Sequence, residues 1–281
     1  MGDVWDRTQE VLSGRGGMLA GIAVVAMFVP AAVNAAVRAY MPPSIGAALI
    51  GAVLTLVVTI LALWGQLAII AASTDPAVDR DEATGAANRR LAPALGVAVI
   101  LTVLLAVAFA PLVVLLVRAG VDLAAISQGV QPAAIVPGVA ALAALYTLVL
   151  GVALLFAGVR LVPLYAVVLH ERRGAGAIAR CWRLTRRHSW RLVGVVVLFL
   201  IVLGVATIAA QSVVGLALRL ILGGDAVATV AFLATLAGQA ASTALTLVAI
   251  VFSAQLYVAL IAREAELRAR ADRSIPPIAD A

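Results

Sequence analysis

The sequence predicts an all-α, polytopic membrane protein with six transmembrane helices and both termini in the cytoplasm. Of its 281 residues, 64% are hydrophobic and only 12% are charged. A globular domain of this length carries about a quarter charged residues. Apolar runs recur along the whole chain, and each is long enough to cross the ~30 Å hydrocarbon core of a bilayer. The chain is therefore expected to fold within a membrane.

The N-terminal residues 1–17 are polar and predict a short amphipathic helix. Val4, Trp5 and Thr8 lie on one face at helical spacing, with charged residues opposite. Such a helix is expected to lie in the membrane interface. The apolar run at 18–40 follows an acidic rather than a basic leader, so we interpret it as a retained span and not as a signal peptide.

Each further apolar run has a polar boundary at both ends. The run that ends at residue 170 is longer than a bilayer requires, and Pro163 is its expected kink site. The six predicted spans are 18–40, 45–72, 94–117, 137–170, 190–222 and 227–261.

A weak internal repeat accompanies these spans. A short polar helix is expected before each pair of spans, and the inner ends of the even-numbered spans resemble one another, as in GQLAII and AQLYVA. The chain therefore predicts a six-helix transmembrane domain over residues 1–262, built as three repeats of an amphipathic helix plus two spans. The expected repeats are 1–74, 75–170 and 171–262, and a partly disordered cytoplasmic tail follows at 263–281.

The basic residues predict the orientation. All twenty are arginines; sixteen lie in the termini and the even-numbered connections, against three in the outer turns, at Arg38, Arg118 and Arg219. Positive residues concentrate on the cytoplasmic side of membrane proteins. We therefore expect a multi-pass protein of a bacterial inner membrane. The net charge of +6 is interpreted as this topology signal, and because aromatic residues that stack on bases are scarce, no nucleic-acid partner is expected.

An arginine-rich helix over residues 176–190 is the main candidate for a binding site. On a helical wheel its arginines share one face and Trp182 lies on the other, which predicts a helix lying on the inner leaflet. The open alternatives are topology control alone and the binding of anionic lipid headgroups. The residues expected to bind headgroups are Arg180, Arg183, Arg187, Arg191 and Trp182.

Polar side chains within the spans form a second candidate feature. They share helical faces and predict either hydrogen bonds between helices or the lining of a polar pathway. Arg160, inside the fourth span, is expected to extend to the interface or to find a partner. The intramembrane polar residues singled out are Arg160, Thr235, Gln239, Ser242, Thr246 and Gln66, with Ser253 on the same face of span six.

Several classes of chemistry have little support. The spans contain no Asp or Glu, which ion-coupled transporters use to carry the coupling charge. One cysteine and two histidines leave little from which to build a metal site. Arg160, His170, Glu171 and His188 are the only candidates for a titratable cluster. We therefore expect no metal, no cofactor and no catalytic residues.

Two stretches resemble the membrane domain of the glycerophosphoryl diester phosphodiesterase membrane-domain family. They are LHERRG, AIARCWRL and WRLVG within 169–194, and AQLYVALIAREAE at 254–266. Cys181 stands where serine is common in that family. The resemblance implies a six-helix membrane domain, and these 281 residues have no room for the phosphodiesterase domain that some members carry.

These observations favour a non-catalytic integral membrane protein. It is expected to act as a lipid-associated scaffold, with anionic membrane lipids as partners, or as an accessory subunit of a membrane complex. The alternatives are a channel or uncoupled transporter for a small solute or lipid, and an intramembrane enzyme linked to phospholipid metabolism. A water-accessible cavity between the polar stripes would favour transport.

Overall fold

A computed structural model describes residues 2–42, 44–121, 137–171, 174, 176–185, 189–223 and 226–274. These ranges are almost entirely helical and contain no strand. Six helices in them are long and apolar enough to cross a membrane. The predicted fold class and number of spans are confirmed.

The N-terminal segment is not a separate interfacial helix, as the sequence suggested. α1 (Gly2–Ala23), a π-helical turn η1 (Val24–Phe28) and α2 (Val29–Tyr40) form one continuous helix. Its first turns are packed against protein: Val4 is buried with Val159, Leu192 and Leu256. Of the apolar face that suggested lipid contact, Val4 and Thr8 are therefore buried, whereas Trp5 is exposed. Residues 1–17 contain no proline that would stop the helix.

The π-helical turn has a local cause in Pro30. Proline lacks an N–H group, and its ring clashes with the carbonyl four residues earlier, here that of Ala26. The chain widens over η1, where the N–H of Val29 donates to the carbonyl of Val24. This turn faces α3 (Ile45–Thr74), and an added Cβ at Gly65 would lie 2.5 Å from the Cβ of Ala26. The two helices meet here at a distance that only glycine allows.

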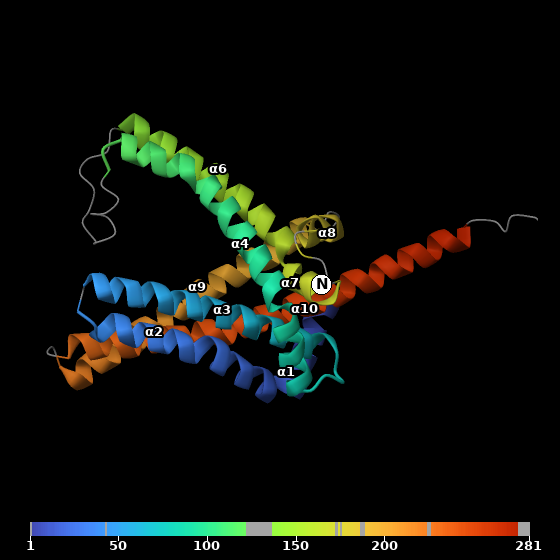
Figure 1. The fold of residues 1–281 in the computed structure, drawn as a ribbon, viewed down its shortest axis with the longest axis horizontal. Coiled ribbons are helices and arrows are strands. Elements are labelled where there is room, and N and C mark those ends of the chain that lie inside the picture. Colours follow the sequence, from blue (N-terminus) through green and yellow to red (C-terminus); the bar gives the residue numbers. More distant parts are fainter. Residues whose placement is uncertain are drawn as a thin grey trace, which may run out of the picture.

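The third helix also merges two predicted elements. α4 (Arg80–Arg118) starts at Asp79, whose side chain accepts a hydrogen bond from the N–H of Glu82, and runs through Pro93. The short helix expected within residues 75–93 is thus the first part of α4. Figure 1 shows this teal part lying across the end of the bundle before the green part turns away. A proline such as Pro93 leaves one carbonyl of the preceding turn without its hydrogen bond. It bends a helix without ending it when other groups form a hydrogen bond with that carbonyl.

The fourth span is interrupted as predicted. α6 (Pro137–Leu161) is followed by a turn at Val162 and Pro163 and then by α7 (Leu164–His170). The kink site at Pro163 is confirmed. α8 (Gly176–Thr185), α9 (Ser189–Leu222) and α10 (Val227–Ser274) complete the chain.

The helix α10 is much longer than its predicted span. At 1.5 Å per residue its 48 residues extend about 72 Å, more than twice the hydrocarbon thickness. The tail expected from residue 263 is helical as far as Ser274, and residues 275–281 lie outside the described part. Both figures show this red helix projecting alone beyond the bundle.

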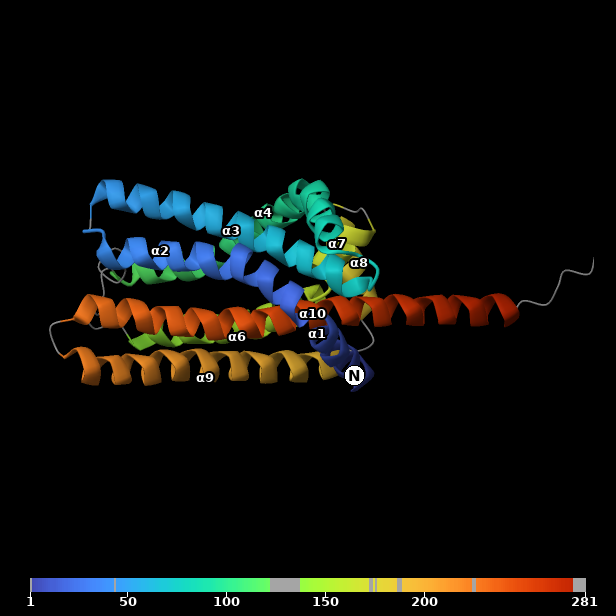
Figure 2. The same ribbon diagram turned by 90° about the horizontal axis from the view of Figure 1, so that it is seen from below.

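The spans form three antiparallel pairs, α2–α3, α4–α6 and α9–α10. In each pair, the end of the first helix and the start of the second lie at the end of the molecule opposite the start of α1, α8 and the projecting end of α10 (Figures 1 and 2). α2, α3, α9 and α10 run together, whereas the α4–α6 pair leaves them at an angle (Figure 1). The start of α1 and the end of α10 therefore lie at the same end as the arginine-rich helix.

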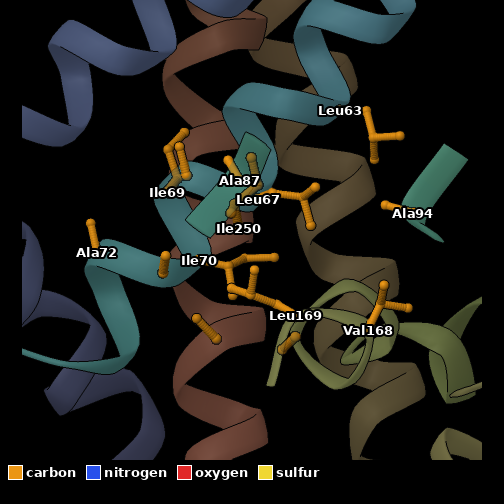
Figure 3. Close-up of a cluster of buried hydrophobic side chains, with 14 of the residues drawn as sticks. Leu63, Leu67, Ile69, Ile70, Ala72, Ala87, Ala94, Val168, Leu169 and Ile250 are labelled. Carbon is orange, nitrogen blue, oxygen red and sulfur yellow. The ribbon is translucent and has the colours of Figure 1, made fainter. Parts of the chain in front are cut away.

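The core lies near this arginine-rich end. Figure 3 shows its centre, to which α3, α4, α7 and α10 contribute Leu67, Ala87, Val168 and Ile250. The outer parts of the spans are different: Ile45 is 85% exposed in the isolated chain. Such apolar faces suit contact with lipid tails. The packing that positions side chains precisely is thus at the end where the charges gather.

Candidate functional site

The helix α8 is attached to the core by its small residues. Ala177, Cys181 and Thr185, spaced at four-residue intervals, are buried, and the Thr185 hydroxyl donates to the carbonyl of Cys181 at 2.8 Å. These three residues face the bundle, and Ala177 and Cys181 belong to its core.

Arg180 holds α8 to two other helices. Its Nε lies 3.0 Å from Glu171 Oε1, and Nη1 and Nη2 donate to the two carboxylate oxygens of Glu264 at 3.0 and 2.5 Å. The three side chains are 15%, 16% and 27% exposed, respectively. Such paired, two-pronged contacts are the strongest hydrogen bonds that proteins form. We refer to these three residues as the Arg180 cluster.

The Arg180 cluster corrects one expectation about lipid. The carboxylate of Glu264, followed by that of Glu171, holds the pKa of the Arg180 guanidinium above its ordinary value. Both partners are acids of the chain itself, so most of the donors of Arg180 are already used. Its main role here is to position α8. A side chain shared between two carboxylates has little left to offer a headgroup.

Beside this cluster, a groove of about 320 Å³ runs between α8 and α10. Arg183 lines it and is exposed, and within the described part of the chain it has no ion-pair partner. Arg268 also lines it and pairs with Glu264 at 2.7 Å. The groove combines four arginines and one glutamate with three leucines; its lining is Arg180, Arg183, Leu184, Leu260, Arg263, Glu264, Leu267 and Arg268.

The other predicted headgroup residues have different positions. Arg187 lies outside the described residues, as does the side chain of Arg191. Trp182 is 45% exposed and does not line the groove. Its ring is covered by the Arg160 guanidinium, 4.2 Å from the ring centroid. Arg160 has thus found a partner, and a cation over an indole contributes about 0.5–2 kcal/mol.

The polar stripe of span six is only partly covered. Thr235 is exposed, and the hydrogen bond between helices that is one of the two expected roles of the stripe does not form at that residue. Its hydroxyl donates to the carbonyl of Ala231 in its own helix, which satisfies it without a second helix. Gln239, Ser242, Thr246 and, on α3, Gln66 are half-buried. Ser253 is buried and likewise bonds within its helix, to the Ile250 carbonyl.

One buried polar contact between helices involves a residue that the sequence did not single out. Gln255 is buried and donates from Nε2 to the carbonyl of Ser73 at 2.6 Å, which joins α10 to α3. Gln211, one of two polar residues that share a face of the fifth span, lies against Gly238 of α10, where an added Cβ would be 2.4 Å from its Cγ. The partners of both residues depend on which helices become neighbours, which a helical wheel does not show.

Arg15 was counted as a topology signal, and the structure adds a second role. Its Nη1 donates to the carbonyls of Ala72 and Asp75 at 2.7 and 3.1 Å, and its Nη2 to that of Val78. The last carbonyls of a helix have no intrahelical donors. Arg15 therefore caps the end of α3 and fixes the turn into α4.

The candidate titratable residues do not converge on one site. Glu171 binds Arg180, whereas His170 lies 3.0 Å from the Thr74 hydroxyl and stacks on Tyr257. Arg160 covers Trp182, and His188 lies outside the described residues. Among the residues that the structure describes, no three of His, Cys, Asp and Glu gather as metal ligands do.

Cys181 is expected to be unreactive in the folded protein. It is fully buried, and burial, reinforced by the Glu171 carboxylate, raises the pKa of its thiol to about 12. The thiolate is the reactive form. At pH 8 the thiolate fraction of Cys181 is then on the order of 10³-fold smaller than that of an ordinary thiol of pKa ~8.5. Alkylation by N-ethylmaleimide should be at least ~100-fold slower in mild detergent than after unfolding in dodecyl sulfate.

A cysteine placed at the exposed Ala179 of the same helix provides the control. In the double variant Cys181→Ser/Ala179→Cys, labelling of the folded protein should be fast. Equal rates for the native Cys181 and this exposed cysteine would contradict the buried placement of the α8 face.

Comparison of the chain with known protein families, curated proteins and solved structures finds no match. The resemblance to the glycerophosphoryl diester phosphodiesterase membrane-domain family stays a prediction, and the function has to be argued from the geometry.

Proposed function

We propose that the chain is a lipid-associated scaffold of a bacterial cytoplasmic membrane, which retains anionic phospholipid in the groove between α8 and α10. One observation carries this proposal: exposed arginines and three leucines line the same groove. Because Arg180 is held by Glu171 and Glu264, the phosphate is matched by Arg183 and Arg268, and the leucines match the first carbons of an acyl chain. Anionic membrane surfaces attract each such arginine with about 1 kcal/mol.

The position of the groove supports the same proposal. It lies at the end of the molecule that holds the start of α1, the end of α10 and the arginine-rich helix, the end that the arginine asymmetry assigns to the cytoplasm. The groove is open, since Arg183 and Leu267 are both exposed. A headgroup entering from the inner leaflet meets the arginines at the level of α8.

The test replaces Arg183 and Arg268, two of the three exposed arginines of the groove, and leaves Arg180, Glu171 and Glu264 unchanged. The double variant Arg183→Gln/Arg268→Gln should retain about tenfold to thirtyfold less phosphatidylglycerol, because two contributions of about 1 kcal/mol are lost. Bound lipid is counted by native mass spectrometry after reconstitution in mixed phosphatidylglycerol–phosphatidylcholine nanodiscs. Retention by the unchanged protein should fall with added salt, because exposed charges are screened over ~8 Å at physiological ionic strength.

Arg273→Gln is the matched control, since Arg273 lies on the projecting part of α10 and outside the groove. It should retain phosphatidylglycerol as the unchanged protein does. If the double variant and the control retain equal amounts of phosphatidylglycerol, the groove arginines do not bind lipid and the proposal is refuted.

A further inference from the structure

A second groove lies on the other side of the cytoplasmic end and has a different charge pattern. It measures about 690 Å³ and is bounded by the last turn of α3, the first turns of α4 and the end of α7. Its charged lining consists of three acids and two arginines, namely Asp75, Asp81, Glu82, Arg89 and Arg90.

The wall of this groove is built from side chains that are held in place. His170 lies 3.0 Å from the Thr74 hydroxyl, and its ring stacks on Tyr257 with centroids 5.6 Å apart and planes inclined by 11°. The turn between α3 and α4 is capped by Arg15 through three carbonyls. The groove therefore does not depend on a loose loop.

The acids and bases of the groove are spaced so that they do not neutralise each other. Seven residues separate Glu82 from Arg89, about 10 Å along the helix, whereas helical ion pairs need a spacing of three or four residues. Within the described part of the chain, no ion pair joins Asp81 or Glu82 to Arg89 or Arg90. Two acids and two arginines of α4 thus line one groove without pairing with each other.

Gly85 brings the basic charge closer to the acids. A Cβ at this position would lie 3.5 Å from Arg89 Nη1, so the guanidinium folds back along the helix to the level of Gly85. That level is three residues from Glu82, about 4.5 Å along the axis. The separation between positive and negative groups is then about one helical turn.

Each pair of charges has a separate, general explanation. Acids in the first turn stabilise a helix through its dipole, and paired arginines mark the cytoplasmic side. Neither explanation accounts for both pairs lining one groove whose floor includes apolar residues such as Ala86 and Leu169. These residues lie where the spans end, the depth of phospholipid headgroups.

We propose that this groove binds a phosphoethanolamine group, with its primary ammonium at Asp81 and Glu82 and its phosphate at Arg89 and Arg90. A primary ammonium donates three hydrogen bonds to carboxylates, as a lysine does. A trimethylated ammonium donates none, so phosphatidylcholine is the natural comparison. The group could come from phosphatidylethanolamine or from free O-phosphoethanolamine, which share this chemistry.

The experiment measures lipid selectivity for the full chain in nanodiscs that contain equal phosphatidylethanolamine and phosphatidylcholine. The unchanged protein should retain phosphatidylethanolamine preferentially. In Asp81→Asn/Glu82→Gln the ratio of the two bound lipids should fall about fivefold or more, since two exposed charge contacts are lost. Arg89→Gln/Arg90→Gln should lower the retention of both lipids, because both carry the phosphate.

Arg80→Gln is the matched control in the same helix, because Arg80 is exposed and does not line the groove. Circular dichroism confirms that helix content is unchanged in each variant. Displacement of bound phosphatidylethanolamine by free O-phosphoethanolamine at equal concentration would identify the soluble compound as the source; a lack of displacement identifies the lipid.

The result that overturns this inference is an equal phosphatidylethanolamine to phosphatidylcholine ratio in the unchanged protein and in Asp81→Asn/Glu82→Gln. The inference does not rest on the α8–α10 groove. Arg183→Gln/Arg268→Gln should leave this ratio unchanged while lowering phosphatidylglycerol, so either proposal can fail alone.

Discussion

Replacing Arg180 with glutamine is expected to lower the free energy of unfolding by about 2–3 kcal/mol, the largest effect we expect for any arginine of the chain. The substitution leaves the carboxylates of Glu171 and Glu264 facing one another without the cation that now bridges them. Removing one partner of a fully buried ion pair costs about 3–5 kcal/mol. The cluster retains 15–27% exposure, so solvent reduces this value.

The measurement is unfolding in mixed micelles titrated with dodecyl sulfate and followed by circular dichroism. Arg183→Gln, three residues away on the same helix and exposed, should change the free energy of unfolding by less than ~0.5 kcal/mol. Arg180→Lys should fall between the two, since it keeps the charge but loses the two-pronged geometry. If Arg180→Gln and Arg183→Gln are equally stable, the cluster does not hold α8.

The spans could be predicted because the membrane imposes one rule on every segment that crosses it. Hydrophobic length located all six, and Pro163 predicted the break between α6 and α7 because proline acts through its own helix. Both signals are local. The arginine asymmetry is likewise a sum over single residues, and the structure has the start of α1, α8 and the end of α10 at one end (Figure 1).

The contacts of the candidate site could not be predicted in this way. Glu264 lies 84 residues from Arg180, and Arg15 lies 57 residues from the carbonyl of Ala72 that it caps. A helical wheel reports which face a residue occupies, but not which helix covers that face. The arginines of the termini and of α8 therefore looked alike, although Arg180 and Arg15 bind protein atoms and Arg183 is exposed.

The boundaries of the polar helices were wrong for a related reason. A change from polar to apolar composition was interpreted as the end of one helix and the start of another at residues 17 and 93. Composition does not end a helix; the loss of backbone hydrogen bonds does. α1 continues into η1 and α2, and α4 runs through Pro93. Of the three predicted polar helices, α8 alone is separate within the described residues: α7 ends at His170 and α8 begins at Gly176, with ERRGA between them in the sequence.

Replacing Gly65 with alanine is expected to destabilise the protein by about 1–3 kcal/mol, the usual cost of adding a methyl group to a packed contact. The new Cβ would lie 2.5 Å from the Cβ of Ala26 and 4.0 Å from the Cε of Met27. The first of these contacts cannot be relieved by a rotamer change, because alanine has none. α3 must move away from η1, the turn that Pro30 has widened.

The same substitution at Gly51 of α3 should have the opposite sign. Apart from the neighbouring residues and backbone of its own helix, no atom lies within 4 Å of a Cβ at that position, and alanine is favoured over glycine within a helix by up to ~1 kcal/mol. Both variants gain the same helix propensity from alanine. The difference between their free energies of unfolding, measured by dodecyl sulfate titration, therefore reports the cost of the contact between residue 65 and Ala26 alone. A difference of about 2 kcal/mol or more is expected; equal stabilities would mean that η1 and α3 do not meet at Gly65.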